Sequence, residues 1–165
     1  MNLKGKGIGM QTIIRQIKGR IILDNANHCH IYNCEVYDVG MEGIHLRDNS
    51  SSNIVDMCTI TDTGKVNTGY SGANYADSFI DVKGNNAIIR NNTCNRNNNS
   101  NIVDAFQGSE QLSGWGKNND FYSNTVNLDQ SSGYVLKITG NTTAKASNNT
   151  RIPAGNMYSG NITQY

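Results

Sequence analysis

Three things are scarce in this 165-residue sequence: proline, which occurs once, charged residues, and long apolar runs. Charged residues make up 16% of the chain and the formal net charge is +1, so electrostatics give no reason to expect nucleic acid or a membrane surface as a partner. No stretch approaches the ~18–20 consecutive apolar residues of a membrane-spanning helix. We therefore expect one domain with a hydrophobic core of its own and neither of those two partners.

The first ten residues also lack the pattern of a secretion signal, because no apolar stretch of ~7–15 residues follows their lysines. Gly5, Gly7 and Gly9 make a helix through this segment unfavourable. Three alternatives stay open: a cytosolic protein, a protein exported by another route, and a mature or trimmed chain.

The four cysteines lack the C-x-x-C spacing of a metal site. Cys34 and Cys58 occupy the same place in two copies of a repeated phrase, and Cys94 lies two places further along in a third copy. Buried free thiols that behave as small apolar side chains are therefore favoured over disulfides.

Asparagine is abundant in every part of the chain, together with 17 glycines and short pairs of apolar residues. Asparagine and glycine both disfavour helices, so a helical bundle does not fit. The apolar pairs argue against disorder, which requires low hydrophobicity. The composition therefore favours short strands connected by turns.

One six-residue phrase returns along the chain: an apolar residue, two others, Asn or Cys, one more residue, and a second apolar residue. It is found at 31–36, 55–60, 89–94 and 121–126, and more loosely at 146–151 and 158–163. Its fourth positions are separated by 24, 34, 32, 25 and 12 residues. Self-similarity at this period is typical of a solenoid.

We interpret each phrase as a short strand, followed by a variable loop and a second strand. The second strands are expected at 44–47, 80–83 and 136–139 and, with a poorer fit, at 104–107. Short strands turned by Asn and Gly predict a parallel β-helix, in which equivalent residues of successive coils stack ~4.8 Å apart. The fourth positions should then form an asparagine ladder, made of Cys34, Cys58, Asn92, Asn124, Asn149 and Asn161.

The repeat predicts about five to six coils with two inserted loops, at 64–78 and 108–118. Residues 1–24 should form an incomplete first coil or, alternatively, a cap, and residues 25–140 the regular coils. Residues 141–165 should form an incomplete last coil, because a spacing of 12 residues is too short for a full one. Loops of a solenoid usually build its binding face.

The stretches HIYNCEVYDVG at 30–40, EGIHLR at 42–47 and NYADSFIDVKG at 74–84 resemble the right-handed parallel β-helix repeat proteins related to pectate lyases. The resemblance covers roughly residues 25–140. It implies an extracellular protein that is a polysaccharide lyase or that binds acidic polysaccharide, although some members of the superfamily are not enzymes. Whether this chain is an enzyme stays open.

Stacked coils should bring His45 beside Asp81 and Arg47 beside Lys83 on the outer face of the second strands. The resemblance implies β-elimination on a uronate polymer, with a Lys or Arg base and a Ca²⁺ ion held by Asp residues. Lys83 is the candidate base, with Arg47 disfavouring its charged form by repulsion, and His45 completes the catalytic group. The candidate Ca²⁺ ligands are Asp77 and Asp81.

Trp115, Tyr70 and Tyr75 lie on the inserted loops and are candidate platforms for sugar rings, and Lys137 is a further substrate contact. A structural interpretation competes with this site, since alternating charges on neighbouring strands are ordinary cross-strand pairs. The alternative function is a non-catalytic β-helix that self-associates through its solenoid ends into oligomers or filaments.

Overall fold

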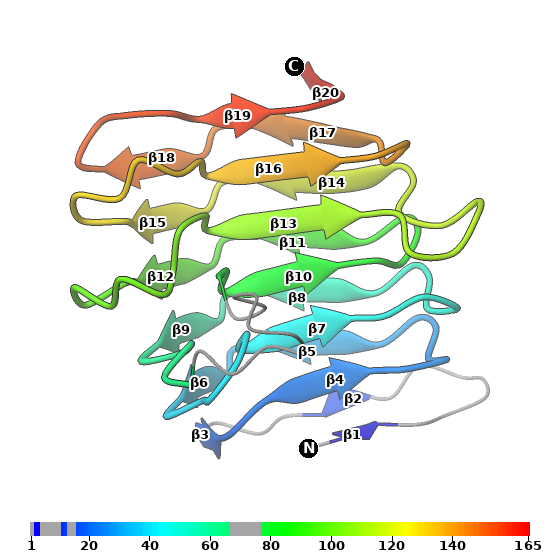
Figure 1. The fold of residues 1–165 in the computed structure, drawn as a ribbon. Coiled ribbons are helices and arrows are strands. Elements are labelled where there is room, and N and C mark those ends of the chain that lie inside the picture. Colours follow the sequence, from blue (N-terminus) through cyan, green and yellow to red (C-terminus); the bar gives the residue numbers. More distant parts are fainter. Residues whose placement is uncertain (1, 4–10, 13–15, 67–76) are drawn as a thin grey trace.

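The computed structural model describes residues 2–3, 11–12, 16–66 and 77–165, and these form twenty short β-strands in three parallel sheets (Figure 1). Successive strands pass from the first sheet to the second and the third, and then return to the first. About six coils stack in this way from the N-terminal to the C-terminal end. The predicted all-β parallel β-helix is confirmed.

The strands are two to four residues long. The first sheet contains β1 (Asn2–Leu3), β4 (Ile21–Leu23), β7 (Ile44–Leu46), β10 (Ile80–Val82), β13 (Phe106–Ser109), β16 (Leu136–Thr139) and β19 (Tyr158–Ser159). The second contains β2 (Gln11–Thr12), β5 (His30–Tyr32), β8 (Ile54–Asp56), β11 (Ile88–Arg90), β14 (Asn119–Tyr122), β17 (Ala144–Ser147) and β20 (Ile162–Gln164). The third contains β3 (Gln16–Lys18), β6 (Glu35–Tyr37), β9 (Thr59–Thr61), β12 (Thr93–Asn95), β15 (Thr125–Asn127) and β18 (Thr150–Ile152).

The repeated phrase is two strands joined by a sharp bend, and each coil therefore has three strands where the sequence predicted two. In the first copy, β5 ends at Tyr32 and β6 begins at Glu35. The residue before each of the first five fourth positions adopts left-handed backbone geometry, with φ between 51° and 55°: Asn33, Met57, Asn91, Ser123 and Asn148. The bend lets the fourth position point inward, which a continuous strand with strict alternation would not allow.

The asparagine ladder runs along the inside of these bends. Asn92 donates a side-chain hydrogen bond to Asn124 (Nδ2 to Oδ1, 3.0 Å), and Asn124 donates one to Asn149 (2.9 Å). Cys34 and Cys58 occupy the same column and are buried. Asn161 is not a member, because it precedes β20 in the second sheet and is exposed. The phrase matched at 158–163 spans β19 and β20 and contains a different turn.

The register of the first sheet also differs from the prediction in one coil. Residues 104–107 were expected to form the strand, but β13 begins two residues later. Phe106 therefore pairs with Ile80, and Gln107 pairs with Asp81. The apolar Ala105 and Phe106 are both fully buried, so hydrophobic alternation could not fix the register here.

Apolar side chains fill the interior of the coils from Ile17 to Ala146. Phe79, Phe106 and Phe121 are among the largest side chains that are fully buried. All four cysteines are free, and Cys34, Cys58 and Cys94 lie in this core, as predicted. Among the described residues, no helix has the length and apolar character needed to cross a membrane.

After β18 the chain adds only β19 and β20, so among the described residues the third sheet has one strand fewer than the other two. These last strands lie at the C-terminal end of the stack in Figure 1. Self-association through the solenoid ends stays a prediction.

Asn124 provides a test of the ladder, because its fully buried amide group makes four hydrogen bonds. Asn124→Ala leaves the backbone N–H of Asn92 and the carbonyl of Ile89 without these partners inside the core. Since an unsatisfied buried group costs about 1–3 kcal/mol, we expect the free energy of unfolding, measured by urea denaturation, to fall by about 2–5 kcal/mol.

Asn161→Ala is the matched control, since Asn161 is exposed and lies outside the ladder. It should change the free energy of unfolding by no more than about 0.5 kcal/mol. Equal losses in the two variants would contradict the assignment of the ladder.

Candidate functional site

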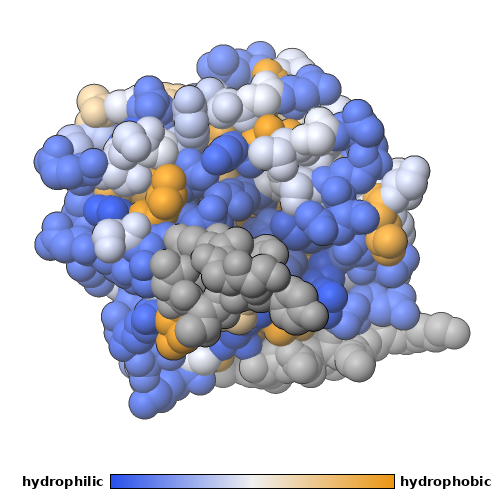
Figure 2. Space-filling model, in the orientation of Figure 1, coloured by the Kyte–Doolittle hydropathy of each residue, from blue (hydrophilic) through white to orange (hydrophobic). Residues whose placement is uncertain are grey.

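A column of polar side chains runs along the outer face of the first sheet. Ile44 and Leu46 of β7 point into the core, so His45 between them points outward. The strand register places His45 next to Asp81, Asp81 next to Gln107, and Gln107 next to Lys137. The described part of this side of the molecule is mostly hydrophilic, with scattered apolar residues (Figure 2).

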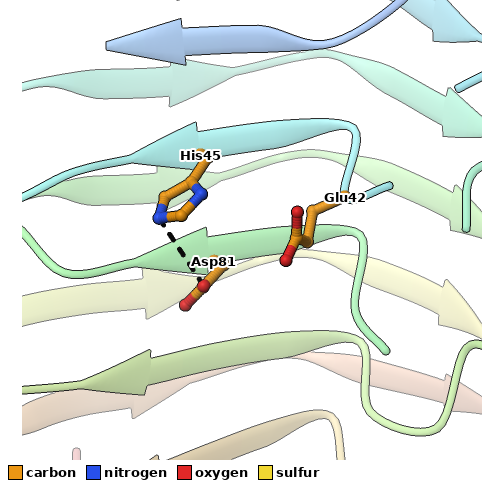
Figure 3. Close-up of side chains that lie close together, drawn as sticks. All are labelled: Glu42, His45 and Asp81. Carbon is orange, nitrogen blue, oxygen red and sulfur yellow. Dashed lines mark ion pairs between the residues drawn. The ribbon is translucent and has the colours of Figure 1, made fainter. Parts of the chain in front are cut away.

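Arg20, which directly precedes β4, joins two residues of the neighbouring coil. One guanidinium nitrogen, Nη2, lies 2.6 Å from Oε2 of Glu42 and 2.5 Å from Nδ1 of His45. Glu42 is only 4% exposed, so its carboxylate has little contact with water. The ion pair supplies part of the stabilisation that burial removes. Figure 3 shows Glu42, His45 and Asp81 grouped across β7 and β10.

Asp81 and Lys83 form the second ion pair of this site. Nζ of Lys83 lies 2.7 Å from Oδ2 and 2.9 Å from Oδ1 of Asp81. Nζ also donates a hydrogen bond to Oγ of Ser109 on the next strand (2.7 Å). Both side chains of the pair are largely buried, at 8% and 15% exposed. Nε2 of His45 lies 3.6 Å from Oδ2 of Asp81.

Burial shifts the pKa values of these groups away from their ordinary range. It raises the pKa of Glu42, although Arg20 opposes the shift. It also raises the pKa of Asp81, against the effect of Lys83. For His45, burial and the positive charges of Arg20 and Lys83 all lower the pKa, to about 3. The imidazole is therefore neutral at physiological pH.

A second group of charges continues the column toward the C-terminal end. Asp104, which is 1% exposed, accepts hydrogen bonds from the backbone N–H of Tyr134 (2.8 Å) and from Nε2 of Gln107 (2.9 Å). Nζ of Lys137 lies 3.6 Å from the same carboxylate and remains 42% exposed. Asp77 is half-buried, and burial raises its pKa against the effect of a hydrogen bond from Gln107.

Glu42, His45 and Asp81 each offer one potential ligand atom, and these atoms lie within 4.8 Å of one another. However, Arg20 already contacts Glu42 and His45, and Lys83 contacts both oxygens of Asp81. Two cations thus balance two carboxylates. Calcium prefers six to eight oxygen ligands, so these residues do not fit it. Asp77 is not in the group, and Ca²⁺ bound by Asp77 and Asp81 stays a prediction.

Arg47 forms an ion pair with a residue of the coil before its own. Its Nη1 atom lies 3.6 Å from Oδ2 of Asp24, on the coil before, and its side chain is 53% exposed. Arg47 and Lys83 thus each have a carboxylate partner of their own, Asp24 and Asp81, and the repulsion expected between the two cations stays a prediction.

The predicted substrate contacts are spread over several elements. Trp115 is half-buried in the loop between β13 and β14, which projects from the stack (Figure 1). Lys137 lies on β16, in the column with His45 and Asp81. Tyr70 and Tyr75 lie outside the described residues.

Sequence reasoning missed Arg20, Asp104, Gln107 and Ser109. The two-residue register error in β13 hid Gln107 and Ser109. In the structure, Gln107 pairs with Asp81, and Ser109 accepts a hydrogen bond from Lys83. Arg20 lies outside any strand, and its side chain reaches Glu42 and His45 from the neighbouring coil. The repeat pattern predicts neighbours only for residues in strands. Arg20 lies outside a strand, so the pattern could not predict its contacts with Glu42 and His45.

The fold and the charged column define a parallel β-helix protein with a paired, partly buried polar site on one sheet. No protein-family model and no curated protein sequence matches the chain. A solved structure does: the crystal structure of alginate lyase from Paenibacillus sp. str. FPU-7, with 38% sequence identity and a TM-score of 0.61. The match covers 90% of this chain and 70% of that one. The chain belongs to the same family as this alginate lyase.

The low pKa of His45 makes the stability of the protein depend on pH. The unfolded chain protonates His45 near pH 6.5, whereas the folded chain does so only near pH 3. Between these two pH values the unfolded state binds more protons than the folded state. The contribution of neutral His45 to the free energy of unfolding is therefore complete above pH 6.5 and is lost as pH falls toward 3. From pH 7 to pH 4, wild type should lose roughly 2–3 kcal/mol more than His45→Gln.

Urea denaturation of both proteins at each pH measures this difference. The comparison isolates His45, because Glu42 and Asp81 titrate in wild type and variant alike. Parallel stability curves for the two proteins would show that His45 is not held neutral in the folded state.

Proposed function

We propose that this protein is a polysaccharide lyase that cleaves a uronate polymer of the alginate type by β-elimination at the first sheet. The observation that carries the proposal is the buried Asp81–Lys83 pair, on the outer face of a β-helix 38% identical to an alginate lyase. A charged pair placed in this way is costly unless it has a role or excellent geometry.

The reaction removes the proton on C5 of a uronate unit, next to its carboxylate. In the proposal, Lys83 is the base in its neutral amine form, while Asp81 holds the proton that Lys83 has given up. Transfer between them is short, since Nζ lies 2.7 Å from Oδ2. The raised pKa of Asp81 supports this assignment, because burial favours the protonated carboxyl group.

The bonding changes then balance within the pair. Lys83 takes the C5 proton, a double bond forms between C4 and C5, and the bond from C4 to the glycosidic oxygen breaks. That oxygen leaves with the electron pair and takes the proton from Asp81. The pair ends as ammonium and carboxylate, which is the ion pair of the structure, and a proton transfer from Lys83 to Asp81 resets it.

Exposed cations along the column support a polyanionic substrate. Lys137 is 42% exposed and Arg47 is 53% exposed, at opposite sides of the Asp81–Lys83 pair. Such charges raise the local concentration of a polyuronate. Trp115, on the loop beside this face, is the proposed platform for a sugar ring. An extracellular location belongs to the same proposal, because a long polysaccharide is met outside the cell.

Lys83→Ala tests the proposal directly. Wild type is incubated with alginate, polygalacturonate and glucuronan, with and without added Ca²⁺, and the ultraviolet absorbance of the unsaturated uronate product is followed. We expect product from alginate, and a rate at least about 100-fold lower for Lys83→Ala because the base is lost. Lys145→Ala, which removes an exposed lysine of β17 on the second sheet, should keep the wild-type rate.

Absence of product with all three polymers, or an unchanged rate in Lys83→Ala, would overturn the lyase assignment. Binding of alginate without cleavage would identify a polysaccharide-binding β-helix instead. A rate that requires Ca²⁺ would restore the metal-dependent mechanism that the family resemblance implied.

A further inference from the structure

The contact between Arg20 and His45 determines where the imidazole carries its proton. A guanidinium group has only N–H donors and stays charged in proteins, so Nη2 of Arg20 donates to Nδ1 of His45 at 2.5 Å. Nδ1 must then be an acceptor, and the single proton of the neutral ring lies on Nε2. Glu42 holds the same Nη2 atom at 2.6 Å and so keeps Arg20 in place.

The Nε2–H group that results is aimed at the proposed base pair. Nε2 is buried and has no hydrogen-bond partner among the described residues. Its neighbour is Oδ2 of Asp81, 3.6 Å away, which is also the oxygen 2.7 Å from Nζ of Lys83. A buried donor without a partner costs about 1–3 kcal/mol, and such groups call for an explanation.

We propose that Arg20 and His45 form a positioning relay for Lys83, an inference that rests on the proposed lyase function. Arg20 fixes the proton of His45 on Nε2, and this N–H directs the carboxyl group of Asp81 toward Lys83. The distance of 3.6 Å is longer than a hydrogen bond, and catalytic contacts of this kind commonly shorten when substrate binds. His45 is thereby a positioning residue, and Lys83 remains the residue that meets the substrate.

Charge explains why a neutral histidine suits this place. Arg20 and Lys83 flank the ring, and Arg47 adds a weaker positive field. A protonated imidazole would therefore face repulsion from three cations, and the carboxylates of Asp24, Glu42 and Asp81 would offset it only in part. The neutral ring avoids that repulsion and still presents an N–H group to Asp81.

Nitrogen NMR of wild-type protein tests the tautomer without any assay of activity. The two ring nitrogens of a neutral histidine have distinct ¹⁵N shifts, according to which one carries the proton. At pH 7 we expect His45 to show the proton on Nε2. A proton on Nδ1, or the pattern of a charged imidazolium, would overturn the relay.

Two substitutions at His45 separate the two ends of the relay. His45→Asn keeps an acceptor near the place of Nδ1 for Arg20, but it has no donor near the place of Nε2. His45→Gln places an amide N–H near Nε2. We expect kcat on alginate to fall roughly 10- to 100-fold for His45→Asn with KM little changed, and to stay within a few-fold of wild type for His45→Gln.

Substitutions at Arg20 provide a second arm. Arg20→Lys retains a donor for Nδ1 and should keep most of kcat. Arg20→Met removes the donor, so kcat should fall and NMR should show both tautomers of His45. If Arg20→Met does not fold because Glu42 loses its partner, the His45 pair still decides the question. Equal kcat for His45→Asn and His45→Gln would overturn the relay. Failure of the proposed function shows differently: wild type then cleaves no polymer, and the NMR spectrum still decides the tautomer.

Discussion

The structure depends on one constraint, the in-register stacking of parallel strands at ~4.8 Å. Each residue has the equivalent residues of the coils before and after it as its nearest neighbours. A side chain is therefore tolerated only when it suits a whole column. The amides of Asn92, Asn124 and Asn149 meet this condition inside the solenoid, because each amide is both donor and acceptor and can bond to the next.

Outside the solenoid, the same stacking assembles charges into pairs. Glu42 and Asp81 would be costly to bury alone, and a cation from the same or an adjacent coil lies beside each, Arg20 and Lys83. The result is a compact group of two cations, two carboxylates and a neutral histidine on a mostly hydrophilic face. Groups with pKa values displaced in opposite directions are common where proteins perform proton transfer.

The family relationship and the site contribute different parts of the functional argument. A shared fold and 38% identity with an alginate lyase narrow the chemistry, but a fold hosts many activities. The residues supply the rest. Lys83 forms an ion pair with Asp81 and donates a hydrogen bond to Ser109, and His45, held by Arg20, lies next to Asp81. Preorganisation of this kind is what acid–base chemistry requires of a scaffold.

Several features were predictable from the residues, and the errors have identifiable causes. The repeat located the coils and placed His45 beside Asp81, because strand alternation and coil period are local properties. It joined the two strands of each phrase into one, because the bend between them is not marked consistently: Asn33 favours left-handed geometry, but Met57 and Ser123 at the same place in other coils do not. It also placed Asn161 in the ladder, although a different turn surrounds that residue.

The sequence by itself determined that this chain is a parallel β-helix with a core of stacked apolar residues, thiols and amides, because those columns repeat along the chain. Only the tertiary structure decided which charges meet. Arg47 turned to Asp24, Lys83 to Asp81, and Arg20 to Glu42 and His45. The physical reason is that a long charged side chain can reach possible partners on more than one coil. That choice depends on burial and distance in three dimensions, and the period of the repeat does not contain it.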